Sequence, residues 1–551
     1  MTSPALSDLH IGAFTSNGPW IVQPDAMPWR TGLDERREAT QRLVPPLIRR
    51  RWLPGLHAVR VTAVLARLLL PWLLFERRRG GDEAIGLLAV RLRRAFERLG
   101  PTFIKLGQLV ASGEGLLPAP LITEFKKLQD RVGEMPLSTV VRVVESDLGG
   151  TVSEFFETFD PTPIAAASIA QVHGATLPGG QPVVVKVQRE GIAETVRKDF
   201  RVMMWIARLL VGRIKAAGLA NPPAYVELFA ETIVEELDFQ LEAQNLLDIA
   251  EVLARTEQRQ IVCPRPHPSL VTRRVLVMER LYGYRIDDID SINAAGIDTA
   301  REMLRGLLSS FFEGAIIFGV FHGDLHAGNT LVTSDGRAAL FDFGITGRFP
   351  EAKRLAVMQM MMASATQDYR SQLSALRDLG MFPPDTDIDV VLADLDIDAL
   401  TAAVTAAADT AVMVENMKLV FGKMLGYGGK IPKELMLLIK GIIYLDGAIT
   451  TLAANLNIGE EVGHLFTYML ETHGDALAVA LGFDVRLMNI DPKEMMAQMT
   501  AMSGLDTDGD VTFGEMRRLQ AQQQAEIREL IQPGRRKRSA ASAPRDEQAN
   551  V

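Results

Sequence analysis

Apolar residues recur at the spacing of an amphipathic helix over most of the chain. This spacing predicts helices over most of the sequence after residue 299, and long helices before it at 82–100, 119–132, 191–217 and 223–255. Pro101 fits the first turn of a further helix, which ends near Gly113, Gly115 and Pro118. The chain is therefore expected to be mostly helical.

Strands are predicted in only a few short stretches. The segment "IAAASIAQVHGATLPGGQPVVVKVQ" indicates two strands joined by a turn at Leu177–Gly180. The segment "RRVLVMERLYG", Arg273 to Gly283, reads as a strand that leads into a linker. A further short stretch, "AALFDFGITG", Ala338 to Gly347, interrupts the later helical region. A few strands followed by many helices predict an α+β fold.

The composition is that of a globular protein. The 551 residues are enough for one large domain or two to three ordinary ones, and 47% of them are hydrophobic against 23% charged. The single cysteine, Cys263, excludes an internal disulfide, and residues 1–27 lack the basic region and apolar core of a secretory signal. We expect a cytoplasmic location, and no nucleic-acid-binding motif is apparent.

The net charge of -9 conceals a basic region near the N-terminus. Residues 28–79 hold twelve Arg against four acidic residues, a local balance of +8, so the remainder carries -17. This region contains "VTAVLARLLLPWLLF", Val61 to Phe75, which is too short to span roughly 30 Å of hydrocarbon. Two interpretations remain open: a helix lying on an anionic membrane surface, or an amphipathic helix packed on its own domain.

Three motifs stand in an informative order. Lys186 ends the apolar run "PVVVK", the stretch "FHGDLHAGN" places Asp324 five residues before Asn329, and "FDFG" places Asp342 thirteen residues after Asn329. A strand lysine, a hinge-like "VMERL", HxDxxxxN and DFG follow one another in this order in protein kinases. The order therefore indicates a protein-kinase-like fold.

Phosphoryl transfer explains why these residue types occur together. Its transition state spreads negative charge over the phosphoryl oxygens, so catalysis depends on positioning and on cations. Asp342 and Asn329 supply the oxygen ligands that Mg²⁺ prefers. Lys186 would hold the α- and β-phosphates of ATP, and Asp324 would orient or deprotonate the acceptor.

The chain also departs from ordinary protein kinases. The stretch "AAASIAQVH", Ala165 to His173, stands where a GxGxxG loop would be expected, and alanine restricts backbone that glycine leaves free. The "HGD" of the catalytic motif lacks the arginine of HRD. No APE motif is visible, and the next helical pattern starts near Pro350, which leaves little platform for a peptide substrate.

These features together resemble the UbiB/AarF (ADCK-type) family of atypical kinases, over roughly Leu99 to Ile458. The markers are "KLGQ", "KLQDRV", "AAASIAQVH", "VVVKVQREGI", "ELDFQLEAQN", "FHGDLHAGN" and "FDFG". The resemblance implies a bilobal kinase-like domain, with an N-terminal KxGQ helical extension folded over the cleft and with ATP and Mg²⁺ as cofactors. It also implies a role in isoprenoid-quinone biosynthesis or lipid handling, with ATPase activity better supported for the class than protein phosphorylation.

The resemblance further implies roles for individual residues. The nucleotide would contact the strand lysine and its ion-pair partner, the Ala-rich loop and the hinge, at Ala165, Ala166, Ala167, Ser168, Ala170, Lys186, Glu242, Glu279 and Leu281. Regulatory positions would be Lys105 and Gln108 of KxGQ, with Glu236 and Asp238 of the ExD pair. Glu242 matches the expected partner of the strand lysine, with Glu236 as the alternative. Asp238 and Glu242, four residues apart, would share a helix face.

We expect five regions along the chain: a basic region at 1–80, the KxGQ extension at 81–149, a kinase-like N-lobe at 150–282, a C-lobe at 283–460, and a helical C-terminal region with a tail at 461–551. The predicted protein is an ATP-binding atypical kinase or ATPase peripheral to a membrane. Its expected partners are a nucleotide, an anionic membrane surface or a lipid or quinone precursor, and a second copy or a quinone-biosynthesis complex. A small-molecule phosphotransferase and a non-catalytic nucleotide- and lipid-binding scaffold are the alternatives.

One acidic stretch near the C-terminus remains ambiguous. The segment "GLDTDGDVTFGE", Gly504 to Glu515, has the alternating carboxylates of a calcium loop, but its ligand spacing does not fit one. A solvated acidic turn is the alternative. The last twenty residues have the composition of a disordered tail.

Overall fold

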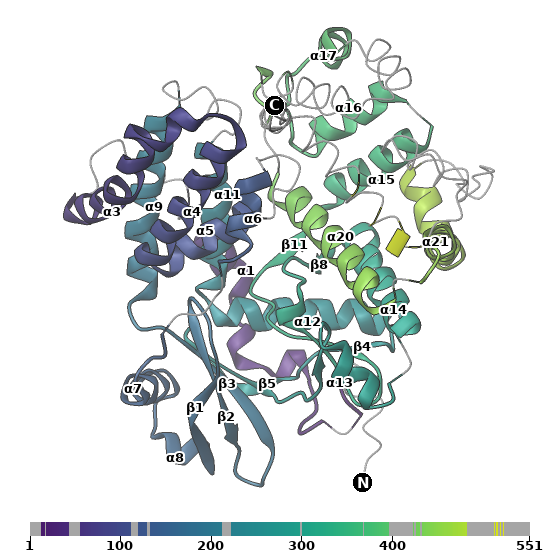
Figure 1. The fold of residues 1–551 in the computed structure, drawn as a ribbon. Helices are drawn as coiled ribbons and strands as arrows, with labels where there is room; N and C mark the ends of the chain where they lie inside the picture. The colour runs from purple at the N-terminus through teal and green to yellow at the C-terminus, as the bar shows by residue number, and fades with distance from the viewer. Residues whose placement is uncertain are drawn as a thin grey trace, which may run out of the picture. The chain divides into compact units, whose positions relative to one another are not determined.

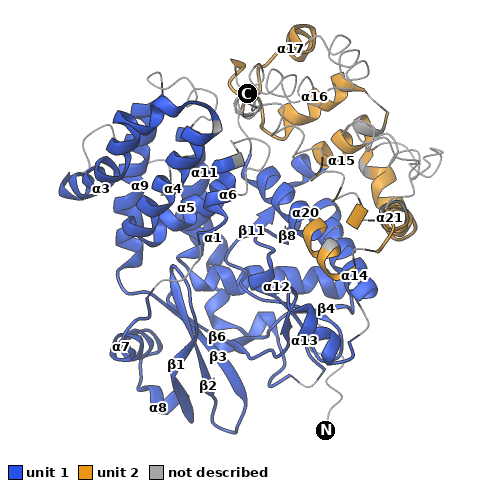
Figure 2. Cartoon of the chain, viewed as in Figure 1, with its two compact units in different colours: residues 1–354, 431–445 blue, residues 355–430, 446–551 orange. Residues whose placement is uncertain are grey.

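A computed structural model describes most of residues 13–481, with its longest gaps at 45–54, 112–118, 129–132, 212–221 and 396–422, and a few positions from 512 to 522. Most of the acidic stretch, 504–511, and the tail from 523 lie outside the described residues. The chain forms two compact units, 1–354 with 431–445, and 355–430 with 446–551 (Figure 2). These are packing units, so the domain limits expected from the sequence stay predictions.

An antiparallel five-stranded sheet forms one part of unit 1. Its spatial order is β1-β2-β3-β6-β5, with β1 at Thr158–Ala166, β2 at Ala170–Thr176, β3 at Pro182–Gln188, β6 at Val275–Glu279 and β5 at Pro266–Val271. The predicted turn joins β2 to β3, where Gly179 and Gly180 have φ of 103° and 85°. These values lie in the left-handed region that glycine adopts without strain, which explains the two adjacent glycines.

One face of this sheet builds a valine-rich core. Val183, Val185 and Val187 of β3 are fully buried and pack against helix α7 (Leu137–Leu148), which is followed by the short α8 (Val152–Phe155). Because side chains alternate across a strand, Lys186 lies on the opposite face of the sheet from these valines. The alternation within "PVVVKVQ" thus positions the lysine.

The single helix predicted at 223–255 is divided in two in the structure. The structure has two helices here, α11 (Pro222–Glu236) and α12 (Phe239–Arg255). Asp238 begins α12 as its N-cap, because its side chain accepts a hydrogen bond from the backbone N–H of Gln240 at 3.1 Å. The expectation that Asp238 and Glu242 share a helix face was therefore wrong: Asp238 precedes the helix and caps it.

The KxGQ extension is helical, as expected. Helices α3 (Gly55–Leu74), α4 (Gly81–Leu99), α5 (Pro101–Ala111) and α6 (Ala119–Phe125) gather with α9 (Ile192–Leu210) and α11 beside the sheet (Figure 1). The close approach of α5 to its neighbours depends on Gly107, the glycine of KLGQ. A Cβ at Gly107 would clash with the side chain of Leu128 and lie 3.1 Å from the ring of Phe96. Glycine at this position lets α5 pack tightly.

The N-terminal segment forms an arm along the sheet and α12, which the sequence did not predict. It contains the turns η1 (Pro24–Ala26) and η2 (Pro28–Arg30) and helix α1 (Leu33–Arg42). The backbone N–H of Cys263 donates to the carbonyl of Ala13, and Trp29 donates from its ring to the carbonyl of His267. Three arginines of the arm, Arg30, Arg36 and Arg37, donate to side chains of α12. Part of the N-terminal arginine excess therefore faces the protein.

Helix α3 is longer than the apolar run predicted. The continuous segment Gly55–Arg79, made of α3 and the turn η3 (Glu76–Arg79), has 25 residues with a mean hydropathy of 1.7 in its most apolar window, of which 11% is buried. By length and composition this segment could cross a membrane, so the expectation that it is too short was wrong. The prediction stopped at Val61 because Arg60 and His57 interrupt the apolar run, although the helix continues through both.

Short strands and turns form the other part of unit 1. After α13 (Ile289–Ala294), α14 (Ala300–Phe312) and the π-helical η4 (Glu313–Phe318) come β8 (Val320–His322), η5 (Ala327–Asn329), β9 (Thr330–Val332), β10 (Ala338–Leu340) and β11 (Thr346–Arg348). Two small sheets join them, with the orders β4-β10-β9-β7 and β11-β8, where β4 is Ile261–Val262 and β7 is Tyr284–Arg285. The first part of α20 (Lys433–Leu452) also belongs to this unit.

Unit 2 is helical in its described part. It contains most of α15 (Glu351–Ala365), with α16 (Tyr369–Asp378), α17 (Ile388–Leu395) and α21 (Ile458–Leu481). Its buried residues include Leu373, Phe382 and Val391, which pack α16 against α17. Of the C-terminal region expected at 461–551, the described part up to residue 481 is helical and belongs to α21.

Candidate active site

Lys186 is the centre of a buried charge cluster. Its ammonium nitrogen lies 2.6 Å from a carboxylate oxygen of Glu242 on α12 and 3.1 Å from one of Asp342. Burial alone would lower the pKa of Lys186, but the two carboxylates outweigh it and raise this pKa. The partner of the strand lysine is thus Glu242, whereas the alternative, Glu236, pairs with Lys105.

Asp342 follows β10 with an unusual backbone. Its φ of 67° is in the left-handed region, and it is one of only two non-glycine residues among those described with positive φ. Such strain persists where surrounding contacts fix it. Here the side chain is held by Lys186 and by the backbone N–H of Gly344 at 3.3 Å. Burial would raise the pKa of Asp342, but Lys186 and Lys105 hold it well below its usual range.

The loop after β8 brings Asp324 and Asn329 together. The side-chain amide of Asn329 donates to the backbone carbonyl of Asp324 at 3.1 Å, and the backbone N–H of Phe341 donates to the carbonyl of Asn329 at 3.2 Å. The backbone N–H of Gly323 donates to the carbonyl of Ile345 at 3.0 Å. These bonds link the two loops that carry the predicted catalytic carboxylates.

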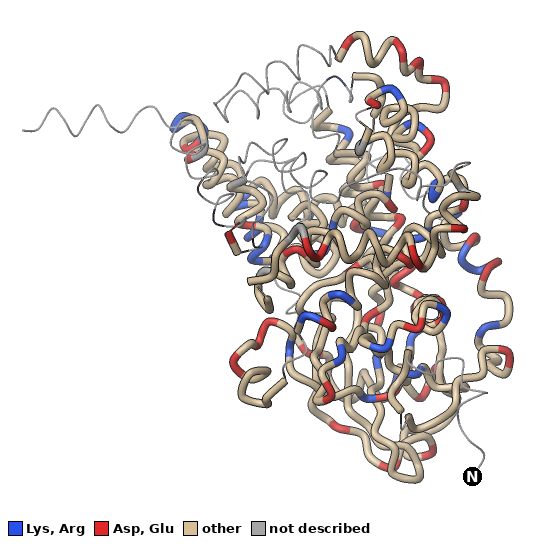
Figure 3. Tube along the Cα trace, turned by 90° about the vertical axis from the view of Figure 1, so that its right-hand side faces the viewer, with Lys and Arg blue, Asp and Glu red and all other residues tan. Residues whose placement is uncertain are grey.

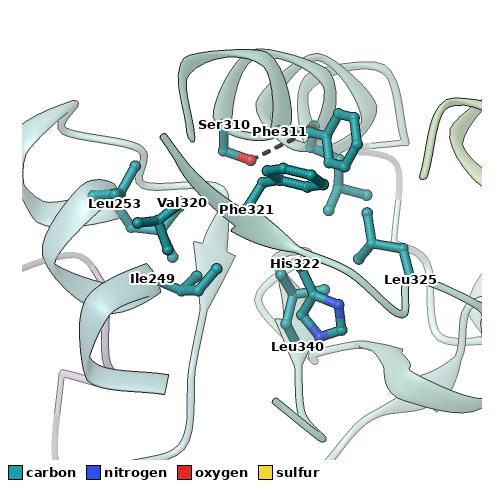
Figure 4. A pocket seen from close by; sticks show the side chains of 11 residues that line it. Ile249, Leu253, Ser310, Phe311, Val320, Phe321, His322, Leu325 and Leu340 are labelled. Atoms are coloured by element: carbon teal, nitrogen blue, oxygen red, sulfur yellow. Dashed lines mark hydrogen bonds between the residues drawn. The ribbon is translucent and has the colours of Figure 1, made fainter. Parts of the chain in front are cut away.

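His322 supports this loop from inside. Its Nδ1 accepts a hydrogen bond from the backbone N–H of Asp324 at 3.2 Å, and burial lowers the pKa of its imidazole to about 4. Its Nε2 is buried and has no hydrogen-bond partner among the described residues. The ring lines a cavity of about 30 Å³ with Leu325, Leu340, Ser310 and Phe321 (Figure 4). Ligand sites are typically several hundred Å³, so this cavity is not the place of a nucleotide or a quinone.

The KxGQ helix places a second lysine beside the catalytic carboxylates. Lys105 of α5 forms an ion pair with Glu236, whose side chain is almost fully buried at the end of α11. Glu236 in turn lies against the DFG loop, since a Cβ at Gly344 would be 3.3 Å from its side chain and 3.2 Å from the carboxylate of Asp342. The positive charge of Lys105 also lowers the pKa of Asp342 and Asp324. Gln108 donates to the backbone carbonyl of Leu128 at 3.3 Å and so ties α5 to the residues after α6.

Asp238 does not take part in this cluster. Besides capping α12, its carboxylate pairs with Arg273 at 3.1 Å. Of the two acidic residues of the ExD pair, Glu236 forms the ion pair with Lys105, whereas Asp238 lies beyond the end of α11 and pairs with Arg273.

The Ala-rich loop joins β1 to β2. Ala165 and Ala166 end β1, Ala170 begins β2, and the backbone N–H of Ala167 donates to the carbonyl of Ala170 at 2.9 Å. The hydroxyl of Ser168 is fully buried and has no partner among the described residues. A buried hydroxyl without a partner is costly. A phosphate oxygen would satisfy it, so the loop fits the nucleotide role expected for it.

Arg189, directly after β3, stabilises the Ala-rich loop. Its Nε donates to the carbonyl of Ala167 at 2.9 Å, and its backbone N–H donates to the carbonyl of Ile169 at 2.8 Å. The sequence prediction did not include this residue among the site residues. In "VVVKVQR" this arginine comes three residues after Lys186. The strand pattern gives no sign that its side chain contacts the Ala-rich loop.

The predicted hinge residues, Glu279 and Leu281, are the last residue of β6 and a residue of the linker after it. The carboxylate of Glu279 is held by Arg265 at 3.1 Å and by the hydroxyl of Thr15, so this side chain faces the N-terminal arm. The backbone N–H of Glu279 donates to the carbonyl of Arg265 at 2.9 Å. Leu281 is half-buried in the linker that follows. Contact of these two residues with a nucleotide stays a prediction.

The donor set can hold magnesium only together with a substrate. Among the described residues there is no group of three or more His, Cys, Asp or Glu side chains that could hold a metal ion. Asp342 and Asn329 offer a carboxylate and an amide oxygen. Mg²⁺ is commonly bound by one or two such side chains and by the phosphates of the nucleotide. These residues therefore fit a metal that arrives with ATP.

Comparison with known proteins agrees with this geometry. Residues 127–375 match the model of the ABC1 atypical kinase-like domain. An uncharacterised aarF domain-containing protein kinase of Arabidopsis thaliana chloroplasts is 35% identical, over 68% of this chain and 74% of that protein. The chain belongs to the ABC1 family of atypical kinase-like proteins. The ABC1 assignment confirms the family and the kinase-like α+β fold expected from the sequence.

Two further ABC1 relatives show how far the similarity extends. An uncharacterised protein of Mycobacterium tuberculosis, Rv0647c, is 33% identical over 69% of this chain and 78% of its own. A protein of Marinobacter nauticus named "Probable protein kinase UbiB" is 36% identical over 58% of this chain and 58% of its own. The matched ABC1 domain contains the strand lysine, both catalytic loops and Glu236.

Helix α20 contributes residues to the ABC1 site that the sequence did not reveal. Lys440 forms an ion pair with the carboxylate of Asp324. Burial would raise the pKa of Asp324, but Lys440 and His326 outweigh it and lower this pKa to about 2. The helix begins more than a hundred residues after the catalytic loop, and "LLIKGII" gives no sign that its lysine faces an aspartate.

Proposed function

We propose that this protein binds ATP with Mg²⁺ and transfers or hydrolyses its terminal phosphoryl group, in support of isoprenoid-quinone or membrane-lipid metabolism. The observation that carries the proposal is the Lys186–Glu242–Asp342 cluster beside the loop of Asp324 and Asn329. A scaffold without catalysis has no need of a buried Lys186–Glu242 pair that contacts the partly exposed carboxylate of Asp342, since burying an ion pair carries a desolvation cost.

The residues of the site would divide the work as follows. Lys186 would neutralise the α- and β-phosphates, while Glu242 keeps the lysine in place. Mg²⁺, when bound by Asp342 and Asn329 with the phosphates, supplies charge neutralisation during transfer. Asp324 would accept the proton of the attacking hydroxyl or water, for which it must be ionised, and its pKa of about 2 keeps it ionised at neutral pH.

A small acceptor or water fits the site better than a peptide. Only seven residues, 344–350, separate Asp342–Phe343 from helix α15, and three of them form β11. Protein kinases present peptides on a longer activation segment. Lys105 of α5 is also paired with Glu236, whose side chain lies against Gly344 of the DFG loop. These observations favour an ATPase or a small-molecule phosphotransferase over a protein kinase.

Nucleotide binding provides the direct test. Mg-ATP should raise the melting temperature of the wild type, because a ligand specific for the folded state at a hundredfold excess over Kd stabilises it by about 2.7 kcal/mol. Asp342→Asn should remove the magnesium-dependent part of this shift. Asp389→Asn is the matched control, since Asp389 lies on α17 and is exposed. An equal magnesium-dependent shift in Asp342→Asn would exclude this aspartate as the metal ligand.

The membrane part of the proposal rests on helix α3. Its exposed apolar side chains include Leu56, Val59, Leu70, Leu73 and Leu74, and Phe75 follows directly. The opposite side packs on the protein: Trp72 donates to the carbonyl of Ala84 on α4, and His57 pairs with Asp199 on α9 at 2.6 Å. A helix held along one side and apolar on the other fits a membrane surface better than a span.

Charge next to α3 favours an anionic surface. Basic and acidic residues are interspersed along the described chain (Figure 3), but Arg77, Arg78 and Arg79 are three consecutive exposed arginines at the end of this apolar helix. Each basic residue near an anionic surface contributes about 1 kcal/mol to binding. We therefore propose an anionic bilayer as the partner of this face.

A further inference from the structure

Helix α20 meets the catalytic loop through one face. Lys440 pairs with Asp324, and the hydroxyl of Tyr444 donates to the hydroxyl of Thr330 at 3.3 Å. Leu437 lies against Gly323, since a Cβ there would be 3.1 Å from its side chain. These three positions are spaced three and four residues apart and so share one side of the helix. Lys440 is thereby fixed at the acceptor side of the site.

Lys440 occupies a distinct place among the cations near the carboxylates. Lys186 serves Glu242 and Asp342, and Lys105 is paired with Glu236. The imidazole of His326 is farther from Asp324, with 3.8 Å between its Nε2 and the carboxylate. Lys440 is half-buried and makes the direct contact. Its charge therefore stands where a hydroxyl would approach Asp324.

We propose that Lys440 is a further catalytic residue, which contacts the phosphoryl group as it passes from ATP to the acceptor. This inference rests on the proposed phosphoryl transfer. In the step, the acceptor oxygen forms a bond to the γ-phosphorus, and the bond from this phosphorus to the bridging oxygen breaks. The electron pair of that bond stays on ADP, and the acceptor proton goes to Asp324. The ammonium of Lys440 stabilises the equatorial oxygens of the transferred group, and its ion pair with Asp324 holds that carboxylate in position.

The test measures turnover and nucleotide affinity separately. Lys440→Met should lower kcat for ATP about 10²- to 10³-fold, as removal of one transition-state donor commonly does. Nucleotide affinity should stay within about threefold, because the phosphate contacts of the ground state belong to Lys186 and the metal. Lys440→Arg, which keeps the charge, should restore at least a tenth of the activity. A kcat for Lys440→Met within threefold of the wild type would overturn the proposal.

The controls separate this proposal from the proposed function. Lys433→Met removes another lysine of α20, which pairs with Glu235 at 3.5 Å, and should keep wild-type kcat. If Lys440→Met melts at a far lower temperature than Lys433→Met, Lys440→Arg is then the informative variant. A folded Lys440→Arg with wild-type nucleotide affinity and no recovered turnover would contradict the role of the charge. A wild type that binds Mg-ATP without any turnover refutes both proposals, whereas an active wild type with an active Lys440→Met refutes this one alone.

Discussion

The side-chain amide of Asn245 donates a hydrogen bond to the backbone carbonyl of Phe343, with 3.0 Å between nitrogen and oxygen. Its carbonyl oxygen accepts from Arg37 at 2.9 Å and from Arg348 at 2.8 Å. Asn245 is one turn after Glu242 on α12, so one helix carries both the partner of Lys186 and the support of the DFG loop. The N-terminal arm reaches this network through Arg37.

We predict that Arg37→Ala destabilises the fold by about 1.5–3 kcal/mol, the usual range for a lost hydrogen bond to a charged group. The lost bond frees one side of Asn245, so the position of Phe343 and Asp342 should also become less well fixed, and kcat should fall. Denaturant unfolding and ATP turnover on the same preparations measure both effects. Arg42→Ala is the control on the same helix.

Arg42 is a suitable control because it is an arginine on the same helix, α1, as Arg37 but has different contacts. It pairs only with Glu38, and both side chains are more than two-thirds exposed. Such surface pairs contribute between 0 and about 1 kcal/mol. If Arg37→Ala costs no more than Arg42→Ala, the arm is not part of the network around the DFG loop.

The sequence indicated the candidate site residues more clearly than the residues that hold them in place. Short motifs with visible residue types and spacing contain Lys186, Asp324, Asn329 and Asp342. The choice of Glu242 over Glu236 needed the break between α11 and α12, which a helical periodicity does not mark.

The arm and α20 could not be predicted in the same way. Arg37 bonds to a residue 208 positions away, and Lys440 pairs with one 116 positions away. A local sequence pattern does not identify a partner so far away along the chain. The excess of arginine at 28–79 was visible in the sequence. Which of these arginines contact α12 and which face solvent depends on how the arm packs.

Removal of the anionic contact should release the protein from membranes. We predict that the triple change Arg77→Gln, Arg78→Gln and Arg79→Gln lowers binding to vesicles containing phosphatidylglycerol about 100-fold, because three charges at about 1 kcal/mol each are lost. Binding of the wild type should weaken with salt. Vesicle sedimentation measures the bound fraction.

The apolar face of α3 is tested separately. Leu73→Ser with Leu74→Ser should also weaken binding, since both side chains are exposed and would be buried in the bilayer surface. Val479→Ser is the control, because Val479 is an exposed apolar residue on α21. These local changes replace a deletion of residues 1–80, which would also remove the arm. Salt-independent binding that survives both sets of changes would show that α3 is not the contact.

The contact between Lys105 and Glu236 should control access to the site. We predict that Lys105→Met changes ATP turnover several-fold while nucleotide affinity stays within about threefold, because Lys105 is paired with Glu236 and not with Glu242 or Asp342. Lys186→Met should lose nucleotide affinity itself. Equal loss of nucleotide binding in both variants would place Lys105 in the phosphate site.

The same ion pair makes stability depend on pH in a defined direction. Burial raises the pKa of Glu236, and Lys105 opposes this rise. In Lys105→Met the opposing charge is gone, so the folded-state pKa rises further above the unfolded value of about 4.3. A group with a raised folded pKa binds its proton more tightly in the folded state, and this stability is lost as pH rises through the window between the two values. The destabilisation caused by Lys105→Met should therefore be larger at pH 7 than at pH 5.

Denaturant unfolding of the wild type and Lys105→Met at both pH values measures this difference. Because the pKa of Glu236 is raised in the wild type as well, the informative quantity is the gap between the two proteins and not the slope of either. Adding Glu236→Gln to Lys105→Met removes the titrating group, so the gap should then be the same at pH 5 and pH 7. A gap that stays constant for Lys105→Met alone would mean that Glu236 is not held ionised by Lys105, and the KxGQ helix would then be fixed by packing at Gly107 and not by charge.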